Sequence, residues 1–312
     1  MTGPRLSALV RPRRLVSGDT VAVVATSGPL LPERLRRGVA LLDSWGLRVR
    51  VGAHALDTDP AYPFLAGTDD DRAADLAAAW CDPSVAAVLI GRGGSGASRL
   101  VDRLDWSAMR AAGPKLLVGF SDVTVLHEAV ATHLGVASLF GPMPASVVLG
   151  EVPPDAASVE HLRHTLFDPE TVQLIAGDAT GVVPGRASGV LVGGTVSALA
   201  STIGTPESRP ANGGIAVLED VGEVPYRLDS LLTQLLRTGW FDGVRGVVLG
   251  SWTDCGDGAA ELVTARLGDL GVPIVTGLPF GHCAPQLTIP LGVAATLDAG
   301  AGTLTLHEPA LS

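Results

Sequence analysis

The chain alternates short β-branched runs with helical stretches, and this alternation is the feature that most restricts its fold. The predicted strands of the first half are Thr20–Ala25, Leu47–Val51, Val85–Ile90 and Lys115–Val118. The predicted helices have apolar residues at helical spacing: Pro32–Trp45, Asp69–Trp80 and a stretch from about Asp122 to His133. Strands that alternate with helices favour parallel pairing, so we expect an α/β fold whose N-terminal domain is a doubly wound parallel sheet.

The pattern changes after residue 145, where prolines and aspartates interrupt the chain and only Ala157–Leu166 reads as a helix. We expect an N-terminal domain at 1–145, a linker at 146–185 and a smaller C-terminal α/β domain at 186–312. The strands predicted for the second domain are Gly189–Val192, Gly214–Leu218, Gly246–Gly250 and Pro273–Thr276. The helices predicted for it are Thr195–Ile203, Tyr226–Thr238 and Ala259–Leu270. A hairpin of Val293–Leu297 and Thr303–His307 should close the fold.

Charge and cysteine content argue against several classes of function. The 22 Lys and Arg against 32 Asp and Glu give a net charge of −10 without a basic stripe, so nucleic acid is not an expected partner. The three cysteines fit neither a disulfide framework nor a thiolate metal site, and we expect no metal and no cofactor. Gly18, Asp19 and Thr20 interrupt the apolar stretch that an export signal needs, and no apolar run is long enough for a membrane helix. We therefore expect a cytoplasmic protein with no membrane partner.

Ser121 has the most informative setting of the candidate catalytic residues. It lies between the end of a predicted strand and the start of a helix, where a serine hydroxyl can be exposed and the N–H group of Asp122 is free to face an oxyanion. The alternative is that Ser121 or Asp122 only caps the helix.

A glycine-rich segment, Gly91–Gly96, follows another predicted strand and must be a loop. Because the carboxyl ends of parallel strands meet at one edge of a sheet, this loop and Ser121 should lie together. The loop could supply a second N–H group to an oxyanion, bind phosphate, or form a turn without chemistry. Its spacing matches neither GxGxxG nor the P-loop.

His282 and Glu219 are candidates for a base and its acidic partner. His282 follows the predicted strand at 273–276, whereas His127, His133 and His307 fall on a helix or on the terminal hairpin. Glu219 lies at the end of a predicted strand, where its carboxylate can orient a histidine. Asp220 and Glu223 are candidates for the same role, and their spacing does not distinguish the three. A structural histidine and solvated carboxylates are the alternatives.

Several segments in order resemble the LD-carboxypeptidase family, which includes muropeptide LD-carboxypeptidases and peptidases that give immunity to microcin C. The segments are Ser27-Gly28-Pro29, Gly91-Arg-Gly-Gly-Ser-Gly96, Gly119-Phe-Ser-Asp-Val-Thr124, Val217-Leu-Glu-Asp-Val-Gly-Glu223 with Tyr226-Arg-Leu-Asp229, and Pro279-Phe-Gly-His282. The resemblance spans nearly the whole chain. The chain departs from the family at Ser95, where members often have Tyr, and this concerns substrate contacts only.

The resemblance implies a site between two domains, with Ser121 as nucleophile, Glu219 as triad acid and His282 as base. It implies that the backbone N–H groups of Gly94 and Asp122 form the oxyanion hole. The implied enzyme is a serine carboxypeptidase that releases terminal D-Ala from a murein tetrapeptide through an acyl-enzyme. The implied partner is a small peptide or muropeptide, and the implied assembly is a homodimer.

Three other functions remain open at the level of sequence. A family peptidase for peptidyl-nucleotide conjugates would share every motif. An ordinary α/β-hydrolase esterase would need the GxSxG elbow, but Val123 stands at the second glycine. A two-domain binding protein would close on a small molecule and need none of the triad. Arg92 and Arg227 are candidate contacts for a substrate carboxylate.

Overall fold

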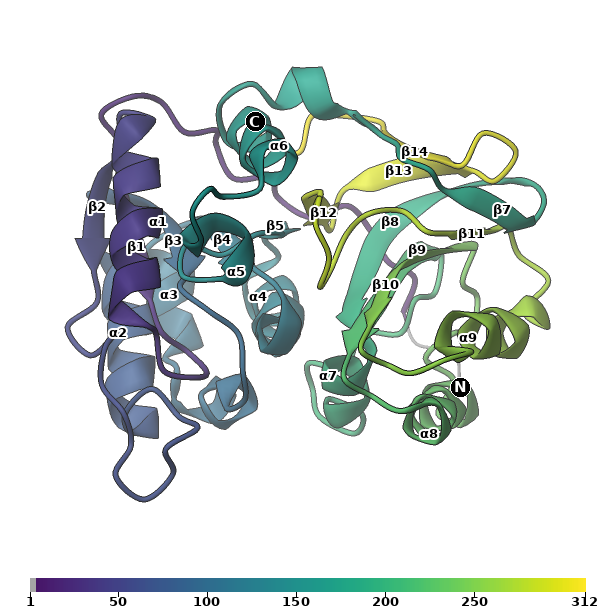
Figure 1. The fold of residues 1–312 in the computed structure, drawn as a ribbon, viewed down its shortest axis with the longest axis horizontal. Helices are drawn as coiled ribbons and strands as arrows, with labels where there is room; N and C mark the ends of the chain where they lie inside the picture. Colours follow the sequence, from purple (N-terminus) through teal and green to yellow (C-terminus); the bar gives the residue numbers. More distant parts are fainter. Residues whose placement is uncertain (1–3) are drawn as a thin grey trace.

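The computed structural model describes residues 4–312, in which two sheets with their helices stand side by side (Figure 1). The first sheet has the strand order β12-β5-β4-β3-β1-β2. Its strands are β12 (Ile289–Leu291), β5 (Ser138–Phe140), β4 (Leu116–Gly119), β3 (Val85–Ile90), β1 (Thr20–Val24) and β2 (Arg48–Val51). Strands β1 to β5 run parallel, and β12 pairs antiparallel with β5. The strand order reverses between β1 and β3, which is where open α/β sheets form their ligand crevice.

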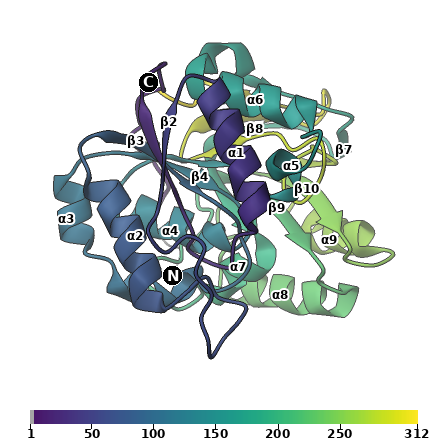
Figure 2. The same ribbon diagram turned by 60° about the vertical axis from the view of Figure 1, so that its left-hand side comes forward.

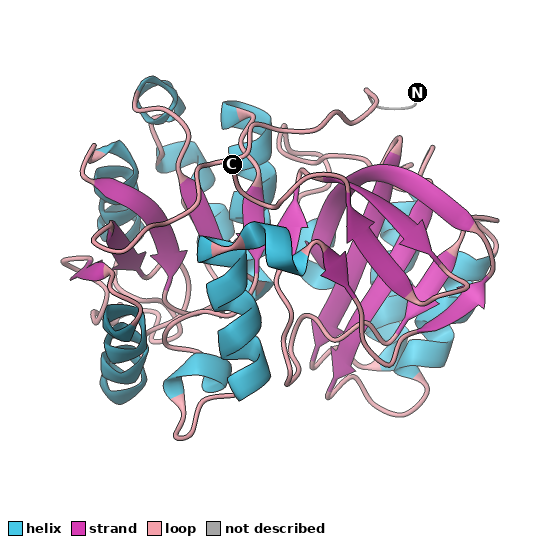
Figure 3. Ribbon diagram, turned by 90° about the horizontal axis from the view of Figure 1, so that it is seen from above, coloured by secondary structure: helices cyan, strands magenta, loops and turns pink. Residues whose placement is uncertain are grey.

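Helices cover both faces of the first sheet (Figure 3). Helices α2, α3 and α4 pack side by side on one face, and α1, α5 and α6 pack together on the other. Their bounds are α1 (Pro32–Ser44), α2 (Asp69–Cys81), α3 (Trp106–Ala111), α4 (Thr124–Leu134), α5 (Val147–Gly150) and α6 (Ala156–Phe167). This arrangement confirms the predicted doubly wound N-terminal domain.

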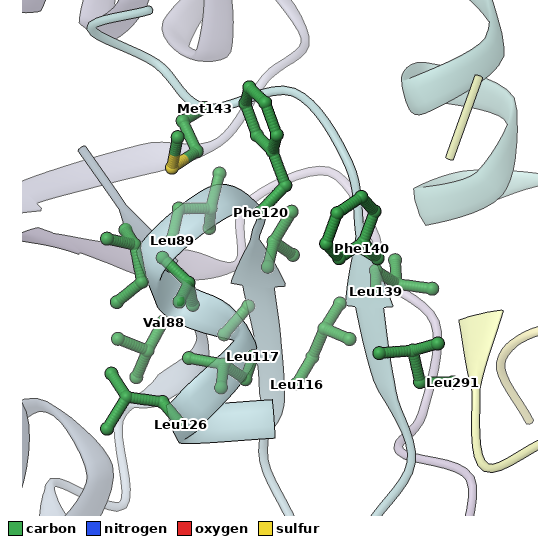
Figure 4. Close-up of a cluster of buried hydrophobic side chains, with 14 of the residues drawn as sticks. Val88, Leu89, Leu116, Leu117, Phe120, Leu126, Leu139, Phe140, Met143 and Leu291 are labelled. Atoms are coloured by element: carbon green, nitrogen blue, oxygen red, sulfur yellow. The ribbon is translucent and has the colours of Figure 1, made fainter. Parts of the chain in front are cut away.

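The core of this domain lies between β3, β4, β5 and their helices (Figure 4). Phe120 and Phe140 make an edge-to-face contact with ring centroids 5.9 Å apart, and both are buried. Leu291 of β12 joins the same cluster from a segment close to the C-terminus. The sequence did not predict that β12 joins the first sheet, because a strand of three residues is too short for its periodicity to indicate which strand it pairs with.

The second sheet contains parallel strands at its centre and antiparallel strands at its edges, in the order β6-β14-β13-β8-β9-β10-β11-β7. The strands are β6 (Leu174–Ile175), β14 (Thr303–Leu306), β13 (Ala294–Asp298), β8 (Arg186–Thr195), β9 (Gly214–Val221), β10 (Gly246–Thr253), β11 (Ile274–Thr276) and β7 (Thr180–Val183). Its helices are α7 (Val196–Ser201), α8 (Pro225–Arg237) and α9 (Ala259–Gly268). The predicted second α/β domain and its terminal hairpin, β13 with β14, are confirmed.

The alternation of side chains along β9 gives the second sheet two different faces. Ala216 and Leu218 belong to the core under α7 to α9, whereas Ile215 and Val217 belong to the large core shared with the first sheet. Successive strand residues point to opposite faces, so Glu219 follows Val217 and faces the N-terminal domain.

The stretch at 146–185 that the sequence suggested as a linker holds two α-helices, a short 3-10 helix (Pro169–Val172) and two strands. Helices α5 and α6 pack on the first domain, and β6 and β7 are the edge strands of the second sheet. The boundaries 1–145, 146–185 and 186–312 remain a prediction. No helix in residues 4–312 combines the length and the hydropathy that crossing a bilayer requires.

Candidate active site

Ser121 lies directly beyond β4 in a conformation that few non-glycine residues adopt. Its φ is +68°, and it opens a short 3-10 turn, Ser121–Val123, that leads into α4. A left-handed serine between a strand and a helix is the geometry of a nucleophile elbow, in which the strained turn presents the hydroxyl group. The structure thus has the elbow without the GxSxG motif. Val123 stands at the position of the motif's second glycine, and its side chain is buried in the core.

His282 connects Ser121 to Glu219. The distance from His282 Nε2 to Ser121 Oγ is 3.1 Å, and that from His282 Nδ1 to Glu219 Oε2 is 2.7 Å. A carboxylate only accepts hydrogen bonds, so Nδ1 carries the hydrogen in this pair and the lone pair of Nε2 faces the serine hydroxyl. The three residues predicted as a triad therefore form one continuous relay.

Glu219 is fully buried, and hydrogen bonds from three donors compensate for its loss of water. Besides the imidazole, Oε2 accepts the backbone N–H of His282 at 3.1 Å. The hydroxyl group of Thr195, the last residue of β8, donates to Oε1. The sequence pattern indicated a helix starting at Thr195 and gave no sign of this contact.

Thr195 also joins the two domains at the site. Its backbone N–H donates to Thr124 Oγ1 at 3.1 Å, and Thr124 is the first residue of α4, three positions after Ser121. Gly194 makes this approach possible, because a Cβ there would lie 2.6 Å from Thr124 Oγ1. The strand β8 therefore continues through Gly193 and Gly194, beyond the predicted end at Val192.

The structure separates Glu219 from its two competitors. Asp220 points to the opposite face of β9, where its carboxylate accepts the backbone N–H of Ser197 at 2.8 Å. Burial raises the pKa of Asp220 to about 6, and the neighbouring Glu219 adds to that rise. Glu223 pairs with Arg227 on the surface, at 3.2 Å between Oε2 and Nε. Only Glu219 of these carboxylates contacts His282.

The glycine-rich loop lies directly against Ser121. A Cβ on Gly93 would be 2.8 Å from Ser121 Cβ, so only glycine fits there without displacing the serine. Gly94 has φ +130°, and within residues 4–312 its N–H group has no hydrogen-bond acceptor. The Asp122 carboxylate accepts the N–H of Ala97 at 2.8 Å and so fixes the loop to the turn of Ser121. Burial raises the pKa of Asp122.

The remaining histidines considered as bases have partners away from Ser121. His127 is buried, with Nε2 at 2.9 Å from the carbonyl oxygen of Gly119, and burial lowers its pKa to about 4. His133 contacts Glu207 at 2.7 Å, and His307 contacts Thr296 on the terminal hairpin. None of these three can reach the serine in place of His282.

A cavity of about 350 Å³ opens over Ser121, between the glycine loop, α1, α5 and the end of β9. Its lining includes Gly94, Arg92 and His282, and also two side chains that the sequence analysis did not single out, Arg34 and Val147. Arg227, the other candidate for a substrate carboxylate, does not line it. Among residues 4–312, no three His, Cys, Asp or Glu side chains are grouped so that they could hold a metal ion.

A serine hydroxyl next to a histidine that a buried carboxylate orients is the arrangement used by serine hydrolases. Two family models match the chain: the LD-carboxypeptidase N-terminal domain over residues 21–141 and the LD-carboxypeptidase C-terminal domain over residues 188–297.

Known proteins agree with these matches over nearly the full chain. A Streptomyces coelicolor protein named "Putative carboxypeptidase" is 56% identical over 97% of this chain and 98% of its own length. The murein tetrapeptide carboxypeptidase of Pseudomonas aeruginosa is 34% identical over 89% of this chain and 92% of its own. The solved structure of a microcin C7 self-immunity protein in complex with aspartyl sulfamoyl adenosine superimposes with a TM-score of 0.87 at 23% identity. That match covers 97% of this chain and 100% of the other and shows the common fold.

These findings define the protein as a two-domain α/β serine peptidase. The chain belongs to the LD-carboxypeptidase family and is a serine-type carboxypeptidase.

Proposed function

We propose that Ser121, His282 and Glu219 are the catalytic triad of an LD-carboxypeptidase that releases terminal D-Ala from a murein tetrapeptide. The observation that carries this proposal is the relay of two hydrogen bonds, 3.1 Å and 2.7 Å long, from the serine through the histidine to the buried carboxylate. The similarity to a murein tetrapeptide carboxypeptidase at 34% identity supports the choice of substrate.

The first half of the reaction forms an acyl-enzyme. Ser121 Oγ attacks the carbonyl carbon of the peptide bond before D-Ala, and His282 Nε2 takes the hydroxyl proton. Glu219 stabilises the imidazolium that results. The N–H groups of Gly94 and Asp122 donate to the oxyanion of the tetrahedral intermediate. The imidazolium then gives its proton to the departing amine, the C–N bond breaks and D-Ala leaves.

The second half repeats these steps with water as nucleophile. His282 Nε2 takes a proton from a water molecule whose oxygen attacks the ester carbon of the acylated Ser121. The intermediate collapses, the proton returns to Ser121 Oγ and the tripeptide leaves with a free carboxylate. Serine, histidine and carboxylate end in their starting states, so the cycle needs no further reactant.

A comparison of three substrates tests the proposal. The wild-type protein should release D-Ala from a tetrapeptide with a D-configured last residue, and should leave the same peptide ending in L-Ala intact, with products measured by mass spectrometry. An aspartyl sulfamoyl adenosine conjugate is the third substrate, because the self-immunity protein with this fold binds it. Cleavage of the conjugate with an intact tetrapeptide would replace the murein proposal with a peptidyl-nucleotide peptidase.

The expected homodimer and cytoplasmic location remain predictions. Sedimentation equilibrium of the purified chain gives the first, and fractionation of cells gives the second.

A further inference from the structure

The cavity over Ser121 has a cationic wall although the protein as a whole is acidic. Arg34 and Arg92 line it, and its lining within residues 4–312 includes no Asp or Glu. The chain carries a net charge of −10, so the average surface repels a carboxylate. Two arginines in the lining of the cavity, with no acidic side chain among the lining residues, favour a negatively charged group there.

Arg34 is held in place more firmly than a surface arginine. It extends from the first turn of α1, and its Nε donates to Glu151 Oε1 at 2.7 Å, with Nη2 on the same carboxylate. Its stem lies flat on the chain at Gly150, where a Cβ would be 2.8 Å from Arg34 Cβ. These contacts fix the guanidinium and leave Nη1 without a partner among the described residues. Arg34 thus lines the cavity and keeps a free donor, Nη1.

The helix that carries Arg34 is itself fixed against the cavity wall. Gly38 of α1 packs on the carbonyl oxygen of Pro144, and a Cβ at position 38 would lie only 2.0 Å from that oxygen. Pro144 belongs to the same segment as Ser146 and Val147, which line the cavity. Figure 2 shows α1 and α5 next to each other on this side of the molecule. A side chain on α1 therefore has a constant position relative to the cavity.

Arg92 is less suited to hold a substrate. It is exposed, its Nη1 donates to the carbonyl oxygen of Pro29 at 2.9 Å, and no carboxylate of residues 4–312 orients it. A guanidinium that an acid already orients loses less freedom when a second carboxylate binds, and its fork can bind two oxygens together.

We propose that Arg34 binds the terminal carboxylate of the substrate and that Glu151 is the residue that positions it. This inference rests on the proposed carboxypeptidase activity and adds the reason why the enzyme removes only a last residue. A peptide that continues beyond the scissile residue has an amide where Arg34 meets the carboxylate. Such a peptide loses the charge-assisted hydrogen bond between its terminal carboxylate and Arg34.

The test compares the tetrapeptide with the same peptide whose terminal D-Ala is an amide. Wild type should prefer the acid, and Arg34→Ala should raise KM for the acid by about ten- to hundredfold while KM for the amide changes little. Arg34→Lys should retain part of the preference, because it keeps the charge and loses the fork. Arg36→Ala is the matched control. It removes the same charge from the exposed face of α1, where Glu33 is the partner of Arg36 among the described residues.

A double-mutant cycle tests the part played by Glu151. Glu151→Gln should raise KM for the acid in the wild-type background and have no further effect in the Arg34→Ala background. An equal effect in both backgrounds would overturn the positioning role. Retention of the acid preference in Arg34→Ala, or its loss in Arg92→Ala alone, would overturn the assignment of Arg34.

The outcome also separates this inference from the proposed function. A wild type that releases both D-Ala and its amide at equal rates contradicts the role of Arg34 and leaves the carboxypeptidase proposal standing. A wild type that cleaves neither peptide contradicts the proposed function itself.

Discussion

Gly281 lies against the carboxylate of Glu219, so that a Cβ at position 281 would be 2.4 Å from Glu219 Oε2. The backbone of Gly281 is left-handed, with φ +91°, and this turn delivers both the N–H and the imidazole of His282 to the same oxygen. The contact between His282 and Glu219 therefore depends on the absence of a side chain at position 281.

Replacement of that glycine by alanine should damage both stability and catalysis. Gly281→Ala adds overpacking, which costs about 1–3 kcal/mol, to the strain of the left-handed backbone. It should also shift His282 and lower kcat by about 10²-fold or more. Gly113→Ala is the control, because Gly113 has a similar φ of +88° and an added Cβ would meet no atom of residues 4–312 within 4 Å. Urea unfolding and kcat are measured for both variants. Equal losses of stability with full activity in both would contradict the role of Gly281.

Two neighbouring carboxylates should respond differently to the same isosteric change. Glu219→Gln should lower kcat by about 10⁴-fold, because an amide neither selects the tautomer of His282 nor stabilises the imidazolium. Asp220→Asn should act mainly on stability, since its carboxylate accepts from Ser197 at the start of α7. Steady-state kinetics of the two variants distinguishes them, and a larger loss of kcat in Asp220→Asn would contradict the assignment.

Thr195 should be required for its hydroxyl group. Thr195→Val keeps the shape and removes the donor to Glu219 Oε1, which leaves a buried carboxylate with one hydrogen bond fewer. The cost for a bond to a charged group is about 1.5–3 kcal/mol, so we expect at least about a tenfold fall in kcat and a lower unfolding midpoint. Thr195→Ser retains the hydroxyl and should recover most of the activity; equal losses in the two variants would refute the role of the hydroxyl.

Glu128 on α4 should make the protein less stable as pH rises. The side chain is buried, and burial raises its pKa to about 7 from the ordinary value of 4.5. The unfolded chain then releases its proton at lower pH than the folded chain, so the free energy of unfolding falls from about pH 4.5 to pH 7 and levels off above. Glu128→Gln removes this loss and should be more stable than wild type by about 1–3 kcal/mol at pH 8, with little difference at pH 4.5. Urea titrations at the two pH values measure this, and a pH-independent difference would show that Glu128 does not titrate as expected.

The sequence predicted the parts of the site that depend on local order. Ser121 and His282 follow β4 and β11, Glu219 lies near the end of β9, and strands separated by helices were recognisable from their β-branched runs. The preference for Glu219 over Asp220 rested on the resemblance alone. The alternation along β9 could have supported it, because Ile215 and Val217 share a face with Glu219.

The contacts between distant segments could not be predicted. Thr195 reaches Glu219 only because β8 pairs with β9, and the register of that pair sets Thr195 opposite Glu219. Arg34 reaches the cavity because α1 packs on the segment of α5, more than a hundred residues later in the chain. Local periodicity contains no information on such pairings, since they depend on how complete elements fit together.

The most direct test of the account is the release of D-Ala by wild-type and Ser121→Ala protein from a disaccharide tetrapeptide and from the free tetrapeptide. Mass spectrometry of the products, with circular dichroism to show that both proteins are folded, gives the answer. We predict release by wild type and none above background by Ser121→Ala. Equal release by both proteins would contradict Ser121 as the nucleophile, and no release by folded wild type would contradict the murein tetrapeptide as the substrate.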